Sequence, residues 1–114
     1  MSAHRPISKA EIVDWTRLDI AQLIALEQEG DATFVGRHNE DNGVGRIFGG
    51  QILAQTLSAA ARTVAAGRPV HSMQLTFCAS GRPALPVRYT VHKLSDGATT
   101  SVRSVHAMQG AKTI

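Results

Sequence analysis

The clearest pattern in the sequence is a helical one that begins after two adjacent glycines. Apolar residues recur at helical spacing and the residues between them are small or polar; the apolar positions are Ile52, Leu53, Leu57, Ala60, Ala61 and Val64. Gly67 and Pro69 then supply a stop signal. The pattern predicts a long helix from Gly50 to Ala65, buried on one face and rich enough in alanine for a sheet to approach closely.

After Pro69 the period changes from helical to alternating. Two runs alternate apolar and polar residues as half-buried strands do, one through Met73, Leu75 and Phe77 and one through Val87, Tyr89 and Val91. Ser95-Asp96-Gly97 is typical of a hairpin turn, and the β-branched stretch 99–108 follows with an irregularity near Arg103 and Ser104 that predicts a bulge. Three consecutive antiparallel strands are therefore expected after the helix.

The first part of the chain is less regular. Residues 1–17 are polar and predict an N-terminal arm. Apolar positions from Leu18 to Leu26 predict a short helix, and residues 33–35 predict a short strand. Segment 37–45 is rich in turn-forming residues and predicts a polar surface loop.

Composition and charge limit the classes of protein to consider. The chain has 114 residues, of which 43% are hydrophobic, enough for one packed domain. A dispersed net charge of +3 with few aromatic residues argues against a nucleic-acid-binding surface. No apolar run reaches the length of a membrane span, and the start of the chain lacks the pattern of a signal peptide. Cys78 is the only cysteine, so we expect no internal disulfide and a cytoplasmic location.

Several short motifs occur together in the order found in a known family. They are Gly45–Gln55 (GRIFGGQILAQ); Leu26-Glu27-Gln28 with Phe34; Val70-His71-Ser72 with Phe77; and Leu94, Asp96, Gly97, Arg103, Val105 and Gln109-Gly110. Together they resemble the acyl-CoA thioesterase II family over residues 20–114. Two stretches depart from it: residues 78–83 replace the usual Arg-Pro-Gly turn, and residues 98–100 replace the usual Arg-Ser-Phe. Both departures affect expected substrate contacts, and neither touches the core pattern.

The resemblance implies a fold and a domain arrangement. It implies an α+β hotdog fold, in which a curved antiparallel sheet wraps around one long central helix. Residues 18–114 would be the N-terminal half of a double-hotdog thioesterase, with 109–112 looking like a turn into a last strand that is incomplete. The resemblance also implies that the hydrolytic triad of Asp, Ser or Thr, and Gln belongs to the second hotdog domain.

The start of the long helix is the best candidate for a substrate-binding site. Thioester hydrolysis needs donors that stabilise the developing oxyanion, and free backbone N–H groups at a helix N-terminus provide them. Phe48, Gly49, Gly50 and Gln51 lie there, and the glycines leave room for a substrate. The alternative is that the glycines serve close packing of helix against sheet, and one pair can serve both purposes.

A catalytic base is harder to find in this sequence. Related single-domain hotdog thioesterases commonly place a carboxylate early in this helix, but no acid occurs from Gln51 to Ala66. Asp41, beside Glu40 in the preceding loop, is a weak candidate, and a solvated loop charge is the better interpretation. His71 is the other weak candidate, with a hydrogen-bonded histidine within the sheet as its alternative. The catalytic residues are therefore unknown in this half.

The remaining polar residues give weaker signals. His92 and His106 are expected to face outward from strands, and Cys78 to be a small buried or strand-edge thiol and not a nucleophile. Arg82, Arg88 and Arg103 suit phosphate geometry, with exposed sheet arginines as the alternative. No grouping has metal-ligand spacing, so no metal and no other cofactor are expected.

The predicted function is hydrolysis of fatty acyl-CoA to free fatty acid and coenzyme A, in lipid metabolism, by the intact two-hotdog protein. The expected partners are the acyl-CoA substrate and a second hotdog domain or a homo-oligomer partner. A catalytically silent hotdog module that binds acyl-CoA or a partner chain is the alternative. A hotdog dehydratase is weaker, because the histidine and acid that such enzymes use are not evident in the sequence.

Overall fold

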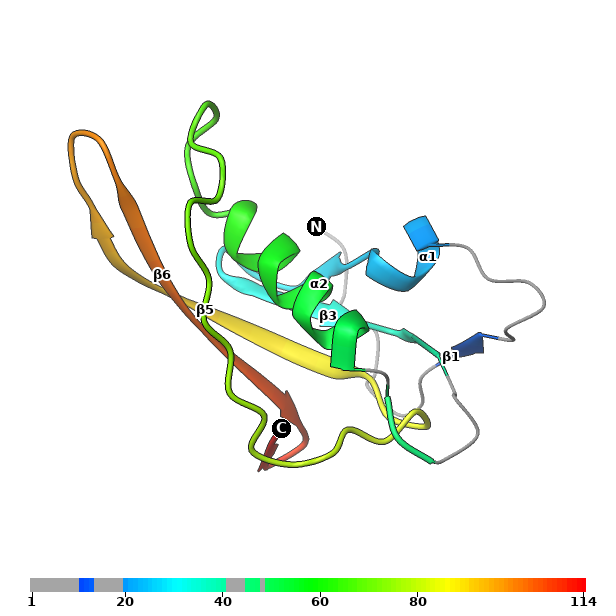
Figure 1. Ribbon diagram of the computed structural model, residues 1–114. Helices are drawn as coiled ribbons and strands as arrows, with labels where there is room; N and C mark the ends of the chain where they lie inside the picture. Colours follow the sequence, from blue (N-terminus) through cyan, green and yellow to red (C-terminus); the bar gives the residue numbers. More distant parts are fainter. Residues whose placement is uncertain (1–10, 14–19, 41–44, 48) are drawn as a thin grey trace.

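An antiparallel sheet with one main helix across its face forms the body of the protein (Figure 1). The structure is a computed structural model, and it describes residues 11–13, 20–40, 45–47 and 49–114. The elements in chain order are β1 (Glu11–Val13), α1 (Ile20–Ile24), β2 (Glu27–Gln28), β3 (Thr33–Gly36), β4 (His38–Glu40), α2 (Gly49–Ala61), β5 (Val87–Asp96), β6 (Ser101–Gln109) and β7 (Lys112–Thr113). No helix within these residues is long and apolar enough to cross a membrane.

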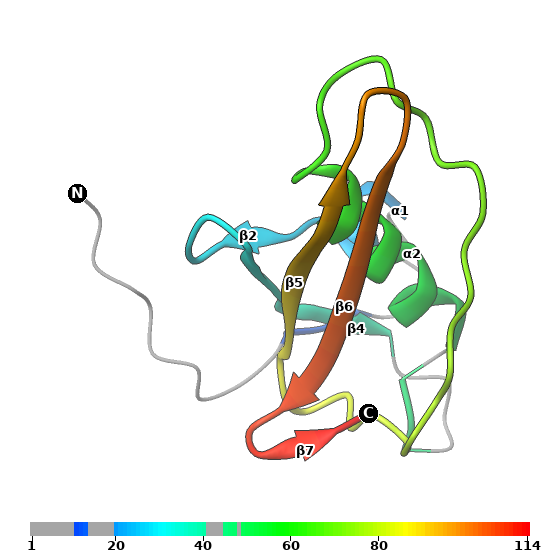
Figure 2. The same cartoon turned by 90° about the vertical axis from the view of Figure 1, so that its left-hand side faces the viewer.

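The main sheet has five strands in the order β2-β3-β5-β6-β7, and every neighbouring pair is antiparallel. The β5–β6 hairpin is its longest part and extends well beyond the other strands in Figures 1 and 2. At the next turn, Gly110 has a φ of 62°, a left-handed conformation that glycine adopts without steric cost. The predicted strands 87–91 and 99–108 are confirmed as β5 and β6, with β5 longer than expected and β6 beginning at Ser101. The turn between them spans residues 97–100, because Ser95 and Asp96 of the predicted turn are paired in the strands.

The apolar core lies between this sheet and α2. The helix contacts β3, β5 and β6, and in both views it lies across one face of the sheet (Figures 1 and 2). The buried apolar residues that form the core are Leu26, Phe34, Ile47, Ile52, Ala59, Val87, Tyr89, Val91 and Ile114. Alternate burial along the first half of β5 agrees with the period-two pattern of the sequence.

The buried stripe of α2 is more polar than the apolar pattern predicts. Gln51, Ile52, Gln55 and Ala59 are its buried residues, whereas Leu53, expected in the core, is 43% exposed. The helix also ends at Ala61 and not at Ala65. Beyond that point the N–H groups of Thr63 and Val64 reach back by only three residues, and the Thr63 hydroxyl donates to the carbonyl of Ala60, which tightens the last turn.

Two glutamines fix the position of α2 through buried hydrogen bonds. The Tyr89 hydroxyl on β5 donates to Gln55 Oε1 at 2.6 Å, and Gln55 Nε2 donates to the carbonyl of Leu23 in α1 at 2.6 Å. Gln51 Nε2 donates to the same carbonyl at 3.0 Å and also to the carbonyl of His38 in β4. Burial raises the pKa of Tyr89 well above its usual value, so the hydroxyl stays protonated and able to donate. We call this set of bonds the glutamine network.

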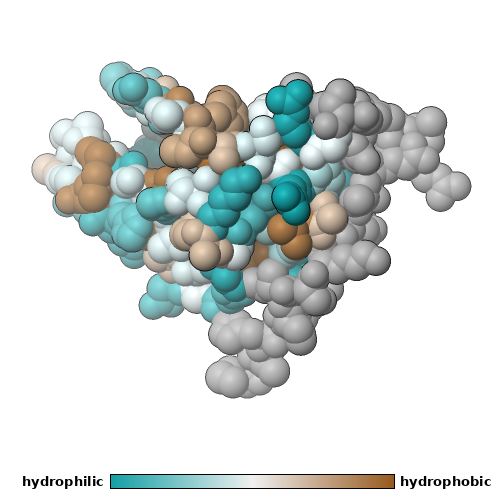
Figure 3. Space-filling view, turned by 90° about the horizontal axis from the view of Figure 1, so that it is seen from below, coloured by the Kyte–Doolittle hydropathy of each residue, from teal (hydrophilic) through white to brown (hydrophobic). Residues whose placement is uncertain are grey.

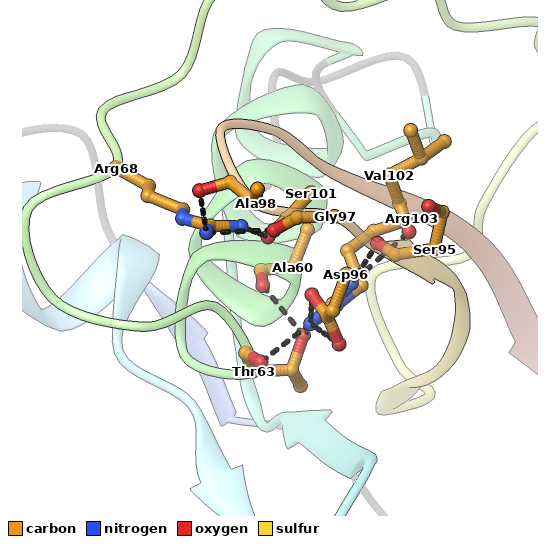
Figure 4. A network of polar contacts seen from close by, with 10 residues as sticks. All are labelled: Ala60, Thr63, Arg68, Ser95, Asp96, Gly97, Ala98, Ser101, Val102 and Arg103. Carbon is orange, nitrogen blue, oxygen red and sulfur yellow. Dashed lines mark hydrogen bonds and ion pairs between the residues drawn. The ribbon is translucent and has the colours of Figure 1, made fainter.

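A second polar network joins the end of α2 to the β5–β6 hairpin (Figure 4). The Arg103 guanidinium donates to the hydroxyl and carbonyl of Thr63, at 2.7 and 2.8 Å, and pairs with Asp96 at 2.8 Å. Arg68 donates to the Ser101 hydroxyl and to the carbonyls of Gly97 and Ala98. The Arg103 side chain is only 5% exposed, so it is not the exposed sheet arginine that its sequence position predicts.

Four sequence expectations are wrong in the described chain. The predicted strand through Met73, Leu75 and Phe77 is a stretch without strand pairing. Residues 38–40, expected in a surface loop, form β4, and residues 11–13, expected in an irregular arm, form β1, its parallel partner. The irregularity lies on β5 between Lys93 and Ser95, which pair with Arg103 and Val102, and not on β6 at Arg103 and Ser104 as predicted.

The burial of Asn39 explains part of the error in segment 37–45. Its side chain is fully buried and its amide donates to the carbonyls of Pro83 and Leu85 at 3.0 and 2.6 Å. Buried carbonyls need donors, and Asn39 provides them from a position that turn propensity assigns to the surface. The short helix and the strand predicted nearby are observed as Ile20–Ile24 and Thr33–Gly36; residues 18 and 19 lie outside the described residues.

Replacing Tyr89 with phenylalanine tests the glutamine network. Tyr89→Phe keeps the ring but leaves Gln55 Oε1 buried without its donor, so we expect a loss of about 1–3 kcal/mol in the free energy of unfolding. Thr90→Val removes a half-buried hydroxyl from the next position of β5 and is the matched control, with a smaller expected loss. Denaturant unfolding measures both, and equal losses would contradict the assignment.

Gly36 offers an independent test of the same contact. A Cβ at Gly36 would lie 2.6 Å from Gln55 Oε1, whereas a Cβ at Gly30 would meet nothing within 4 Å. Gly36→Ala should therefore destabilise the fold by about 1–3 kcal/mol through overpacking. Gly30→Ala should change stability by less than about 1 kcal/mol in either direction. A Gly36→Ala protein as stable as Gly30→Ala, by thermal unfolding, would show that Gln55 is not held in place.

The Arg103 network predicts unequal effects for its two charged members. Arg103→Ala should lower the free energy of unfolding by about 1.5–3 kcal/mol, because it removes the charge-assisted hydrogen bonds that this buried guanidinium donates to Thr63. Asp96→Ala should cost less, because Asp96 is half exposed and its ion pair is screened by solvent. Hydrogen bonds from Ser101 and then Arg103 hold the pKa of Asp96 below its usual value, so its contribution is present at neutral pH and lost on acidification. The free energies of unfolding of wild type and Asp96→Asn should therefore differ at neutral pH and become equal at acidic pH. The same difference at both pH values would contradict this.

Candidate functional site

The N-terminus of α2 is where the structure places the predicted substrate-binding residues. The helix starts at Gly49, Gly50 is exposed, and Phe48 lies outside the described residues. The first backbone N–H groups of a helix have no partner inside it and point outward at its positive end. This end of α2 can therefore offer donors to an anionic or polarised oxygen.

The aromatic ring of Phe77 lies against this helix end. A Cβ added at Gly49 would lie 3.1 Å from Phe77 Cζ, so the absence of a side chain at Gly49 is what lets the ring pack there. Phe77 nevertheless stays 52% exposed. Sequence analysis considered that the glycines serve close packing of the helix against the sheet. Close packing is seen at Gly49, but against the ring of Phe77.

The side chain of Gln51 is not available to a ligand in this arrangement. It is 5% exposed and donates to the carbonyls of Leu23 and His38. Its role in the structure is to position the first turn of α2 against α1 and β4. The sequence analysis did not predict this positioning role for Gln51 or for Gln55. The signal that could have indicated it is the pair of glutamines one turn apart in a helix that has no charged residue.

The structure brings none of the candidate bases to the α2 N-terminus within the residues it describes. Asp41 lies outside them, as does the side chain of Glu40, whose backbone ends β4. His71 is exposed on the unpaired stretch after α2, so its expected place within the sheet is wrong. His71 precedes Phe77, whose ring marks the helix end, by six positions along that stretch.

Two of the three arginines considered for phosphate binding, Arg88 and Arg103, form ion pairs with acidic side chains. Arg88 pairs with Glu29 at 2.9 Å, and Arg103 belongs to the network at the end of α2. Arg82 is exposed, and its backbone N–H binds the side chain of Gln109. Fixed acid partners leave Arg88 and Arg103 poorly placed to meet a phosphate.

The single-residue candidates fall on the surface. Cys78 is exposed, which excludes the buried one of the two positions expected for it, buried or strand-edge, and His92 and His106 are exposed as predicted. In the part of the chain that the structure describes, no three His, Cys, Asp or Glu side chains come together as a metal site would require.

A pocket of about 190 Å³ lies elsewhere, at the edge formed by β2 and β3. It is lined by Ala25, Leu26, Glu27, Val35, Arg37 and His38, and Arg37 and Glu27 form an ion pair at 3.0 Å. None of the residues at the α2 N-terminus lines it.

The surface carries apolar side chains in several places. On the face seen in Figure 3, apolar groups are separated by hydrophilic ones, and one group lies at the left-hand end, which the β5–β6 hairpin occupies in Figure 1. The exposed large apolar residues of that hairpin are Leu94 and Val102; those of the stretch after α2 are Val70, Met73 and Phe77.

Comparison with known proteins identifies the family. The model of the acyl-CoA thioesterase N-terminal domain matches residues 38–114, which include α2 and the β5–β6 hairpin. Human acyl-coenzyme A thioesterase 8 is 41% identical over 95 residues, covering 83% of this chain and 30% of that protein. Acyl-CoA thioesterase 2 of Haemophilus influenzae is 36% identical over 96 residues, covering 84% of this chain and 33% of that protein.

Solved structures agree with these matches. A tesB protein of Mycobacterium avium subspecies paratuberculosis superimposes with a TM-score of 0.75 at 40% identity, over 81% of this chain and 37% of that one. The acyl-CoA thioesterase II of Mycobacterium marinum superimposes with a TM-score of 0.73 at 30% identity, over 83% of this chain and 34% of that one. This chain therefore spans about a third of the length of each of these proteins.

The antiparallel sheet with α2 across it thus matches the hotdog architecture of thioesterases, in agreement with the motifs from Gly45 to Gly110. Sequence, family model and structure agree that the chain belongs to the acyl-CoA thioesterase family and corresponds to its N-terminal domain.

Proposed function

We propose that the full-length protein hydrolyses fatty acyl-CoA to free fatty acid and coenzyme A, and that this chain is its N-terminal hotdog half. The observation that carries the proposal is the match of the thioesterase N-terminal domain model to residues 38–114. That range holds the α2 N-terminus, the glutamines that position it and the hairpin beneath it. In this proposal the sheet curves around α2 and residues 18–114 make up the hotdog.

The role proposed for this half is binding and orientation of the substrate. Phe48, Gly49, Gly50 and the backbone of Gln51 would offer N–H donors at the positive end of α2 to the thioester oxygen or to an anionic group of coenzyme A. Support comes from the exposure of Gly50 and from the glutamine network, which holds this helix end in one position.

The proposed catalytic residues lie outside this half. Hydrolysis requires a carboxylate or another base to activate water, and no acid occurs from Gln51 to Ala66. The family resemblance implies a triad of Asp, Ser or Thr, and Gln in a second hotdog. We place the acyl-CoA pocket between the two hotdogs, the partner being a second domain of the same chain or a homo-oligomer partner.

A catalytically silent module that binds acyl-CoA or a partner chain is the second candidate. The absence of a helix carboxylate favours it for this half taken alone. The setting that we propose for either function is the cytoplasm and fatty acid metabolism, a proposal supported by a single cysteine and by the family's substrate class.

Release of free coenzyme A thiol from palmitoyl-CoA and from a short acyl-CoA tests the proposal. The full-length protein should turn over at least one of them, and Asp41→Asn and His71→Ala should each retain activity within about threefold of wild type, because neither is the proposed base. A loss of about 100-fold or more in either variant would place the base in this half.

The same assay separates the two candidate functions. Binding of acyl-CoA by the full-length protein, measured by calorimetry, without any thiol release would support the silent module and refute the hydrolase. Turnover by the full-length protein would refute the silent module.

A further inference from the structure

Acidic residues are concentrated in the first part of the chain, although the net charge is only +3. From position 42 to position 114 the sequence holds eight Lys or Arg residues and one acid, Asp96. That acid is already paired with Arg103 at 2.8 Å. The part of the chain that forms α2, the β5–β6 hairpin and β7 therefore carries an excess of positive charge, and such an excess attracts anions.

Half of these eight cationic side chains have partners in the structure. Arg88 and Arg103 form ion pairs, and Arg62 and Arg68 donate hydrogen bonds to backbone carbonyls. The other four are exposed, and their side chains form no hydrogen bond or ion pair with any residue that the structure describes; they are Arg46, Arg82, Lys93 and Lys112. These four charges are available to a ligand.

The fold brings Arg46 and Arg82 together although they are far apart in the sequence. The N–H of Ile47, next to Arg46, donates to the carbonyl of Gly81 at 2.9 Å, and Gly81 directly precedes Arg82. A Cβ added at Gly81 would lie 3.0 Å from Ile47 Cδ1, so the two segments pack closely. The two exposed arginines therefore lie at adjacent positions of the backbone.

Gln109 adds Lys112 to this pair. Its side-chain amide accepts from the backbone N–H of Arg82 and donates to the carbonyl of Arg82, both at 2.8 Å. Gln109 also pairs with Lys112 across the turn from β6 to β7, and directly opposed residues share one face of a sheet. Figure 2 shows β7 at the foot of the sheet, below α2. We call Arg46, Arg82 and Lys112 the basic foot.

The immediate surroundings strengthen the positive charge of the basic foot. The segments that form it, 45–47, 78–87 and 107–114, contain no acid. The helix α2 begins three residues after Arg46, and a helix N-terminus adds partial positive charge. Lys93, by contrast, lies further along the hairpin, opposite Arg103 and near the carboxylate of Asp96. Within the described chain, the basic foot is thus where the available cations gather.

We propose that the basic foot binds the phosphate groups of coenzyme A, an inference that rests on the acyl-CoA ligand of the proposed function. A guanidinium donates in a planar fork that matches phosphate oxygens, and an ammonium binds phosphate as a point charge. Coenzyme A carries a diphosphate and a 3′-phosphate, and its flexible pantetheine arm separates them from the thioester. The phosphates can therefore bind beside α2 while the thioester oxygen meets the N–H groups at the start of that helix.

Calorimetric titration of the full-length protein with coenzyme A tests the proposal. The triple variant Arg46→Gln, Arg82→Gln and Lys112→Gln should bind coenzyme A at least about 30-fold more weakly than wild type, because it loses charge-assisted contacts to phosphate. Lys93→Gln removes an equally exposed charge outside the basic foot and is the matched control, with a change of less than about threefold expected. Unchanged affinity in the triple variant, or an equal loss in Lys93→Gln, would overturn the proposal. Inorganic phosphate that binds wild type as tightly as coenzyme A would also overturn it.

Thiol release gives a second readout in the same protein. For the triple variant, KM for acyl-CoA should rise, whereas the kinetics with the same acyl group on pantetheine, which lacks the phosphates, should stay within about twofold of wild type. An equal rise in KM for the acyl-pantetheine would overturn the proposal. Failure of the hydrolase function is distinguishable, because a protein that releases no thiol from any substrate would still lose coenzyme A binding in the triple variant. Thiol release from acyl-CoA that is unaffected in the triple variant would instead refute the basic foot and leave the hydrolase function standing.

Discussion

The hydrogen bond from the Tyr89 hydroxyl to Gln55 joins the sheet to α2, and the rest of the architecture depends on it. Both side chains are buried, where an unpaired polar atom is costly because water cannot replace the lost partner. Through its other end Gln55 reaches Leu23, whose carbonyl at the end of α1 also accepts from Gln51. One tyrosine and two glutamines thus fix the helix relative to β5, α1 and β4.

This constraint explains how the candidate site is positioned. Gln51 belongs to the first turn of α2, so the bonds that satisfy its side chain also orient the backbone N–H groups proposed to meet the substrate. At the other end of the helix, Arg103 binds Thr63 and holds the hairpin against the last turn. The helix is therefore fixed at both ends by polar contacts, while Ile52 and Ala59 supply apolar contact between them.

Most elements could be predicted from the sequence because their signals are local. The hairpin 87–109 follows from alternation and a turn motif, and α2 from apolar spacing after two glycines. The errors arise where long-range contacts decide. Alternation alone predicted a strand at 72–78, but a strand needs a partner, and turn propensity could not anticipate that Asn39 would be buried by donating to Pro83 and Leu85. Gly49 and Gly50 were identified from the sequence at the helix start, whereas the structural role of Gln51 depends on carbonyls from two other elements.

A double-mutant cycle between Tyr89→Phe and Gln55→Leu, measured by denaturant unfolding, tests most directly whether this contact organises the fold. The two side chains share one buried hydrogen bond, so the free-energy changes should not add, and a coupling of about 1 kcal/mol or more is expected. Additivity within about 0.3 kcal/mol would mean that Tyr89 and Gln55 act independently, and would contradict the account of how α2 is held on the sheet.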